Sequence, residues 1–128
     1  MEEFLEPRRL IFVGSSRKDL QAFPGDVRDI IGHALFLAQN GKKHPDAKPL
    51  TGDAAFRGAG VLEVVEDYRG DAYRAVYTVR YKEAVYVLHA FQKRSKQGIK
   101  TPKRETDLIK SRLKDAAAIH EEQARKDK

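Results

Sequence analysis

The sequence contains no cysteine and no long apolar run. Without cysteine, the chain has neither disulfide staples nor thiolate ligands for a metal, and a reducing compartment suits it. The apolar run from Leu10 to Val13 is far too short for a membrane span or for the hydrophobic part of a signal peptide. The first residues are acidic where a signal peptide is basic. We therefore expect a cytoplasmic protein with no membrane partner.

The positive charge is concentrated in one region of the sequence. The chain has 128 residues, a net charge of +6 and a pI near 9.6. Residues 69–104 hold ten basic and two acidic residues, a net charge of +8, so the remainder carries −2. This local positive charge favours anionic partners such as nucleic acid, acidic proteins or anionic lipid. The length suits one hydrophobic core, so we expect a single domain over residues 1–128, with a frayed tail at 119–128.

The hydrophobic periodicity predicts an α+β fold with the element order β-α-α-β-β-β-α. Strands are expected at residues 8–14, 61–68, 72–81 and 84–93, and helices at residues 16–23, 24–40 and 102–118. Residues 42–60 hold prolines and glycines without a sustained period, which predicts an ordered loop. The last three strands form an antiparallel meander. We expect a small antiparallel sheet packed against the two N-terminal helices, followed by a C-terminal helix.

A two-residue turn at Lys82 and Glu83 would sort the side chains of the last hairpin onto two faces. The predicted pairs are Tyr81 with Ala84, Thr78 with Val87, Val76 with His89 and Arg74 with Phe91. One face is then almost wholly apolar, and it is expected to face the core: Tyr73, Ala75, Tyr77, Val79, Tyr81, Ala84, Tyr86, Leu88 and Ala90. The other face gathers Arg74, His89 and Lys93, which predicts a half-open cationic concavity beside the basic segment 93–104.

Two stretches carry a family resemblance: "YRAVYTV" at residues 73–79 and the ending "VLHAFQKRSKQGIKTPKRE". Together with the element order, they resemble the RelE/HigB/ParE superfamily of toxins from bacterial and phage toxin–antitoxin operons. The likeness is strongest to the HigB-like, phage Gp49-related branch. There a last strand ending in Phe precedes a Lys-Lys or Lys-Arg pair, Thr-Pro and a C-terminal helix. The resemblance implies a RelE-like fold and an endonuclease that cuts mRNA in the ribosomal A site. It also implies a cognate antitoxin, expected to be a helix-turn-helix protein similar to HigA.

The resemblance also implies a basic site with few carboxylates. The arginine of the "YR" pair is Arg74, and the basic residues after the last strand are Lys93, Arg94 and Lys96. Two features of the RelE branch are missing. Glu63 and Glu66 stand where that branch has a lysine pair, and no tyrosine follows Tyr86.

Metal-free RNA cleavage needs a base for the 2′-hydroxyl proton, a cation for the phosphorane and an acid for the 5′-oxygen. His89 is the histidine on the predicted cationic face, so it is the candidate base. Arginine suits phosphate, and a lysine among other cations suits proton transfer. The candidate catalytic residues are Arg74, His89, Lys93, Arg94 and Lys96.

Further cations are candidates for binding RNA: Arg80, Lys100, Lys103 and Arg104. Three of these lie at the start of the predicted last helix, where cations oppose the helix dipole, and this indicates a use other than solubility. The remaining histidines, His33, His44 and His120, have no second ligand at metal spacing. The prediction therefore includes no metal site and no cofactor.

Several alternatives remain open at this point. The protein could instead be a ParE-like inhibitor that binds DNA gyrase, or an inactive phage-derived protein that binds nucleic acid. At the level of single residues, His89 could be a packing residue and Arg74 could form a structural ion pair with Glu63. The tyrosines of the apolar face are expected to pack in the core rather than stack on bases.

Overall fold

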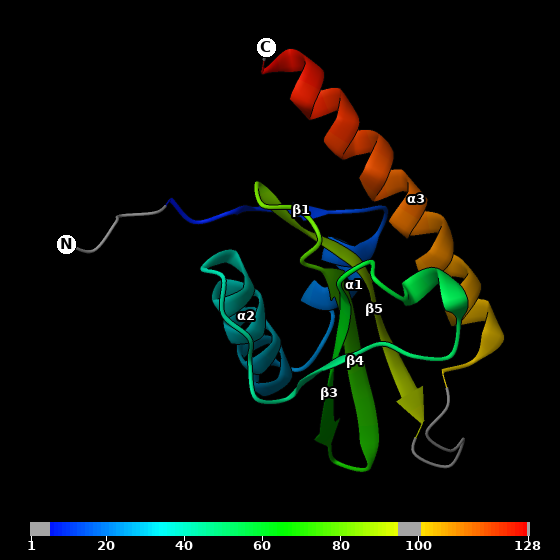
Figure 1. The fold of residues 1–128 in the computed structure, drawn as a ribbon. Helices are drawn as coiled ribbons and strands as arrows, with labels where there is room; N and C mark the ends of the chain where they lie inside the picture. Colours follow the sequence, from blue (N-terminus) through cyan, green and yellow to red (C-terminus); the bar gives the residue numbers. More distant parts are fainter. Residues whose placement is uncertain (1–5, 95–100, 128) are drawn as a thin grey trace.

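The computed structural model describes residues 6–94 and 101–127, with no side-chain description for Arg94. The elements follow one another along the chain as β1 (Arg9–Phe12), α1 (Ser16–Gln21), α2 (Gly25–Gln39), β2 (Ala47–Pro49), η1 (Ala54–Phe56), β3 (Val61–Tyr68), β4 (Asp71–Thr78), β5 (Ala84–Arg94) and α3 (Lys103–Lys126). Figure 1 shows the sheet between α2 and α3. The predicted α+β class and the order of the seven predicted elements are confirmed.

The sheet has five strands in the order β1-β5-β4-β3-β2. Strands β3, β4 and β5 form the predicted antiparallel meander, but β1 pairs in parallel with β5, so the sheet is mixed rather than antiparallel. The predicted loop at residues 42–60 contains β2 and η1. Strand β2 spans only three residues and contains Pro49, and it pairs with Leu62 to Val64 at the edge of the sheet. Proline is tolerated on such an edge.

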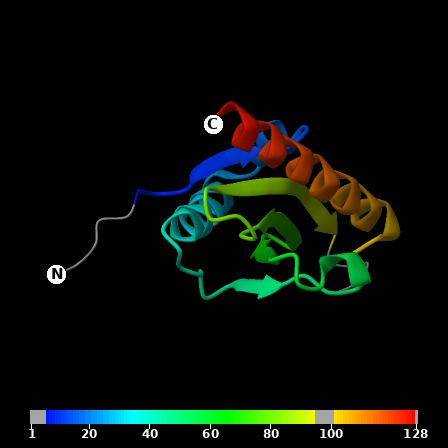
Figure 2. The same ribbon diagram turned by 45° about the horizontal axis from the view of Figure 1, so that its top comes forward.

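Helices cover both faces of the sheet (Figures 1 and 2). Each face has its own hydrophobic core. On one side, α1 and α2 pack against a cluster that includes Val64, Ala75, Tyr77 and Val87. On the other side, α3 and η1 pack against Val76, Tyr86 and Leu88. The expectation of a half-open second face was wrong, because α3 and η1 cover it. Tyrosines pack in both cores, and Tyr77 and Tyr86 are fully buried.

A β-bulge in β5 explains the second apolar face. Val76 pairs with His89, but the next pair is Tyr77 with Val87, so Leu88 is an additional residue in β5. The predicted pairs Arg74–Phe91 and Val76–His89 are therefore confirmed, whereas Thr78 pairs with Tyr86 instead of Val87. The predicted pair Tyr81–Ala84 and the two-residue turn were wrong, because β4 ends at Thr78. Because a shift of one residue exchanges the faces, Tyr86 and Leu88 turn toward α3.

Helix α3 extends through Lys126, so residues 119–126 of the predicted frayed tail are helical. Contacts of His120 hold the first part of this extension against the sheet. Its ring stacks on Tyr81 at 4.0 Å, its Nδ1 lies 3.0 Å from the Tyr86 hydroxyl, and its Nε2 lies 3.2 Å from a Glu83 carboxylate oxygen. Within residues 6–94 and 101–127, no helix is long and apolar enough to cross a membrane.

Candidate active site

The register of β4 and β5 brings three predicted catalytic residues to the face that α3 covers. Arg74 on β4 pairs with Phe91 on β5. His89 lies two residues before Phe91 and Lys93 two residues after it, so all three side chains lie on the face of Arg74. All three polar side chains are buried, with exposed fractions of 5% for Arg74, 6% for His89 and 3% for Lys93. The predicted gathering of these residues is confirmed. The predicted half-open cationic concavity is not, since α3 and the half-buried carboxylates of Glu63 and Glu105 adjoin them.

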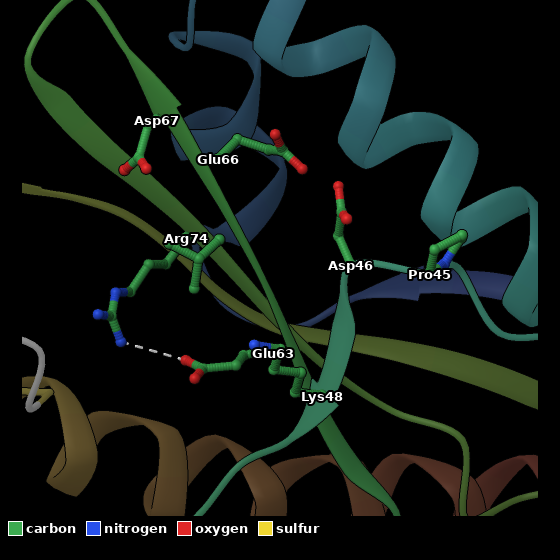
Figure 3. Close-up of a pocket in the computed structure, with 8 residues that line it drawn as sticks. Pro45, Asp46, Lys48, Glu63, Glu66, Asp67 and Arg74 are labelled. Carbon is green, nitrogen blue, oxygen red and sulfur yellow. Dashed lines mark hydrogen bonds and ion pairs between the residues drawn. The ribbon is translucent and has the colours of Figure 1, made fainter.

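Arg74 forms an ion pair across the sheet, as the structural alternative anticipated. Its Nη1 lies 3.2 Å from Oε2 of Glu63 on β3, and it also donates to the hydroxyl of Thr101 at 3.2 Å (Figure 3). Glu63 pairs with Val76, so its side chain lies on the same face and one step diagonally from Arg74. Glu63 thus neutralises part of the basic cluster.

Lys93 lies beside this ion pair. Burial lowers the pKa of its ammonium group, and the charge of Arg74 lowers it further, while Glu63 acts in the opposite direction. A lysine with a lowered pKa is better suited to proton transfer near neutral pH than an exposed lysine.

His89 makes side-chain contacts at both ring nitrogens. Its ring stacks on Phe91, with the ring centroids 4.8 Å apart. Nε2 is hydrogen-bonded to Oε2 of Glu105, in the first turn of α3, and Nδ1 lies 3.2 Å from Nη1 of Arg112. Burial lowers the pKa of His89 and Arg112 lowers it as well, although Glu105 raises it. The balance favours the neutral imidazole.

Arg112 connects three elements from the buried side of α3. Besides His89, its guanidinium donates to the carbonyl oxygen of Leu88 at 3.0 Å and to the hydroxyl of Ser15 at 3.0 Å. Gly14 has a φ of +58°, and a Cβ added there would lie 2.8 Å from Nε of Arg112. Glycine both adopts this left-handed conformation without strain and leaves space for the guanidinium.

Sequence reasoning missed Glu105 and Arg112 as site residues. The signal was present, because Glu105, Ile109, Arg112 and Ala116 recur at helical spacing on one face. The predicted apolar stripe was Ile109, Leu113, Ala116 and Ala117. The residues of α3 that are buried in the structure are Ile109, Arg112 and Ala116. Two charged residues on the buried face of a helix are a pattern that indicates polar partners on the facing strand.

The other predicted residues fall into three groups. Lys103 and Arg104 lie exposed in the first turn of α3, with Lys103 paired to Asp107 at 2.9 Å. Arg80 is exposed in the loop between β4 and β5, at the opposite end of the hairpin from Lys93. The remaining predictions lie outside the described side chains: Arg94, Lys96 and Lys100.

Two cavities flank the Arg74–Glu63 ion pair. One has a volume of about 440 Å³ and extends toward α3. Its lining residues are Leu50, Thr51, Gly52, Glu63, Arg74, Thr101 and Thr106. The other has a volume of about 690 Å³ and lies beside β2 (Figure 3). Both volumes are within the range of small-molecule sites in proteins.

The second cavity also contains a pair of carboxyl groups. Glu66 and Asp46 point toward each other, away from Arg74 (Figure 3). Burial and the adjacent Asp46 carboxyl raise the pKa of Glu66 to about 7. Glu66 and Glu63 thus lie in different surroundings, although both occupy the neighbourhood of the missing lysine pair. Over the described residues, no cluster of three or more histidine and carboxylate side chains is arranged to hold a metal ion.

The model of the family described as phage derived protein Gp49-like matches residues 18–114, which is more than half of the chain. A search of curated proteins gave no significant match. Among solved structures, the toxin–antitoxin complex RelBE2 from Mycobacterium tuberculosis is similar to the chain at 21% identity and a TM-score of 0.42. That alignment covers 72% of this chain and 98% of the other.

The family match places the chain among toxins of the RelE type. Within that class, the chain belongs to the phage-derived Gp49-like family. The resemblance seen in "YRAVYTV" and in the ending after Val87 is therefore confirmed at the level of the family.

Proposed function

We propose that this toxin is a metal-independent, ribosome-dependent mRNA endoribonuclease of the HigB-like kind, which stops translation by cutting transcripts in the ribosomal A site. The observation that carries the proposal is the gathering of Arg74, His89 and Lys93 on one face of the β4–β5 hairpin. The first turn of α3 adds the exposed cations Lys103 and Arg104 beside them. RNA is a polyanion, and metal-free cleavage requires groups that move protons and groups that hold phosphate.

In this proposal the cations divide into two roles. Arg74 stabilises the charge that develops on the phosphate, and Lys93 takes part in proton transfer because its pKa is lowered. Arg94 and Lys96 continue the basic cluster along the chain and are proposed to contact the same phosphate. Lys100, Lys103 and Arg104 are proposed to bind the RNA backbone, where each contact is electrostatic and independent of sequence.

The proposed partners are the mRNA in the ribosomal A site and a cognate antitoxin with a helix-turn-helix domain similar to HigA. The solved complex RelBE2 pairs a toxin with its antitoxin, which supports the expectation of an antitoxin but does not define its kind. Arg80 remains a proposed RNA contact, although it lies at the opposite end of the hairpin from Lys93. If Arg80 binds RNA, the bound RNA must run along the length of the hairpin.

The proposal predicts ribosome-phased cuts in mRNA after the toxin is expressed without antitoxin. Lys93→Met preserves most of the buried aliphatic stem but removes the ammonium group, so we expect the number of mapped mRNA 5′ ends to fall by at least about 100-fold. Lys82→Met is the matched control, because Lys82 is an exposed lysine in the turn at the other end of β5. We expect this control to cut at the wild-type rate.

Two results would contradict the proposal. Intact transcripts together with growth arrest and a DNA-damage response would indicate a gyrase-directed inhibitor instead. Equal cutting by the wild type and by a folded Lys93→Met variant would remove Lys93 from the site. Thermal unfolding of the purified variants shows whether each one is folded.

A further inference from the structure

The contacts of His89 determine which ring nitrogen carries its proton. A guanidinium has only donors, so the hydrogen bond between Arg112 and Nδ1 of His89 requires Nδ1 to be the acceptor. The proton of the neutral imidazole must then be on Nε2, which donates to the carboxylate of Glu105. Arg112 is itself fixed by its bonds to Leu88 and Ser15, so this tautomer is built into the packing of α3.

This tautomer leaves His89 without a lone pair for a substrate. Nδ1 is occupied by Arg112, and Nε2 already carries a proton. The charged groups that face the ring are Glu105 and Arg112 from α3 and Asp19 from α1. Burial outweighs the two carboxylates and lowers the pKa of His89, which favours the neutral imidazole. His89 therefore serves as a hydrogen-bond donor, which is a role different from the base that its position on the sheet suggested.

Glu105 lies at the boundary between this buried network and the exposed cations. It is the third residue of α3, and its side chain is 13% exposed. One carboxylate oxygen accepts from His89, and the other lies 3.5 Å from Nε of Arg104, whose side chain is 92% exposed. Glu63 and Glu105 are two carboxylates that contact predicted catalytic residues. Glu63 forms an ion pair with Arg74, whereas Glu105 also contacts Arg104 in the exposed first turn of α3.

We propose that Glu105 is the general base of the reaction and that His89 and Arg112 position its carboxylate. This inference rests on the proposed endoribonuclease function. The Glu105 carboxylate takes the proton of the 2′-hydroxyl while the 2′-oxygen bonds to phosphorus. The bond between phosphorus and the 5′-oxygen breaks, and the 5′-oxygen takes a proton from the Lys93 ammonium group. The products are a 2′,3′-cyclic phosphate and a 5′-hydroxyl end, and the proton on Glu105 then returns to Lys93 through water.

Substitution by glutamine separates the two roles. Glu105→Gln preserves an acceptor for His89 but cannot take a proton, so we expect single-turnover cleavage on programmed ribosomes to fall about 100- to 10,000-fold. His89→Gln still offers an N–H donor to Glu105, so we expect a loss below about 10-fold. Glu105→Asp retains a carboxylate and is expected to cut faster than Glu105→Gln. Binding to ribosomes is expected to match the wild type for all three variants.

The opposite order of losses, or equally large losses in both glutamine variants, would overturn the assignment of Glu105. Cleavage by the wild type in the same assay tests the endoribonuclease function separately, because its absence would refute that function whatever the variants do. Nitrogen-15 NMR of the ring of His89 is a readout independent of activity. We expect a protonated Nε2 and an unprotonated Nδ1, and the reverse pattern would overturn the tautomer.

Discussion

Replacing Arg112 by alanine should cost the protein much of its stability. Arg112 is 9% exposed, and its guanidinium donates three hydrogen bonds, at 3.0 Å to Leu88, 3.2 Å to His89 and 3.0 Å to Ser15. Removing it leaves the acceptors on Leu88 and His89 buried and without this donor. It also removes an aliphatic stem that packs between α3 and β5.

The magnitude follows from these contacts. A hydrogen bond to a charged group contributes about 1.5 to 3 kcal/mol, and Ser15 is exposed, so water can replace its partner. Two buried acceptors then give a loss of about 3 to 6 kcal/mol. For a domain of this size, that loss lowers the midpoint of thermal unfolding by roughly 10 to 20 °C.

Urea and thermal unfolding followed by far-ultraviolet circular dichroism measure this loss. Lys114→Ala is the matched control, because Lys114 is an exposed cation on the same helix, and such substitutions change stability by about 0.5 kcal/mol or less. A loss below about 1 kcal/mol in Arg112→Ala would refute the reasoning. It would show that Arg112 does not hold α3 against the sheet and would weaken the argument for the tautomer of His89.

Two further predictions concern the surroundings of the site. The folded protein holds a proton on Glu66 up to a pH of about 7, whereas the unfolded chain releases it near 4.5, so stability falls as the pH rises between these values. Glu66→Gln should therefore stabilise the protein by about 1 kcal/mol at pH 8 but not at pH 5 in urea unfolding, and equal effects at both values would contradict the shift. Gly14→Ala should destabilise by about 1 to 3 kcal/mol, because the added Cβ meets Arg112 and the backbone has a positive φ, and an unchanged urea midpoint would contradict this close approach.

Much of the fold could be predicted from local patterns in the sequence. The amphipathic pattern of α2 and the hairpin residues around β4 and β5 gave the element order, and two of the predicted cross-strand pairs were correct. The bulge at Leu88 could not be predicted, because it arises from packing on two faces at once rather than from a local signal. For the same reason the parallel pairing of β1 with β5 was missed, since it joins segments far apart in the chain.

The site was predicted in part for a similar reason. His89 and Lys93 are four residues apart on β5, and Arg74 pairs on β4 with Phe91 between them, so their common face follows from the period of a strand and the pairing of the hairpin. Glu63 lies on the neighbouring strand β3, and its ion pair with Arg74 was one of the alternatives that the sequence left open. Glu105 and Arg112 come from α3, and their contacts depend on how α3 crosses the sheet. The sequence therefore located the cations and one carboxylate partner, but not Glu105. The role of His89 depends on those partners.

The most direct test of this account uses purified toxin, programmed ribosomes and a defined mRNA. We expect cleavage within the A-site codon, a 2′,3′-cyclic phosphate on the upstream fragment, and no cleavage of the same mRNA without ribosomes. The folded Lys93→Met variant should cut at least about 100-fold more slowly under the same conditions. Intact mRNA on ribosomes with the wild-type toxin would contradict the account.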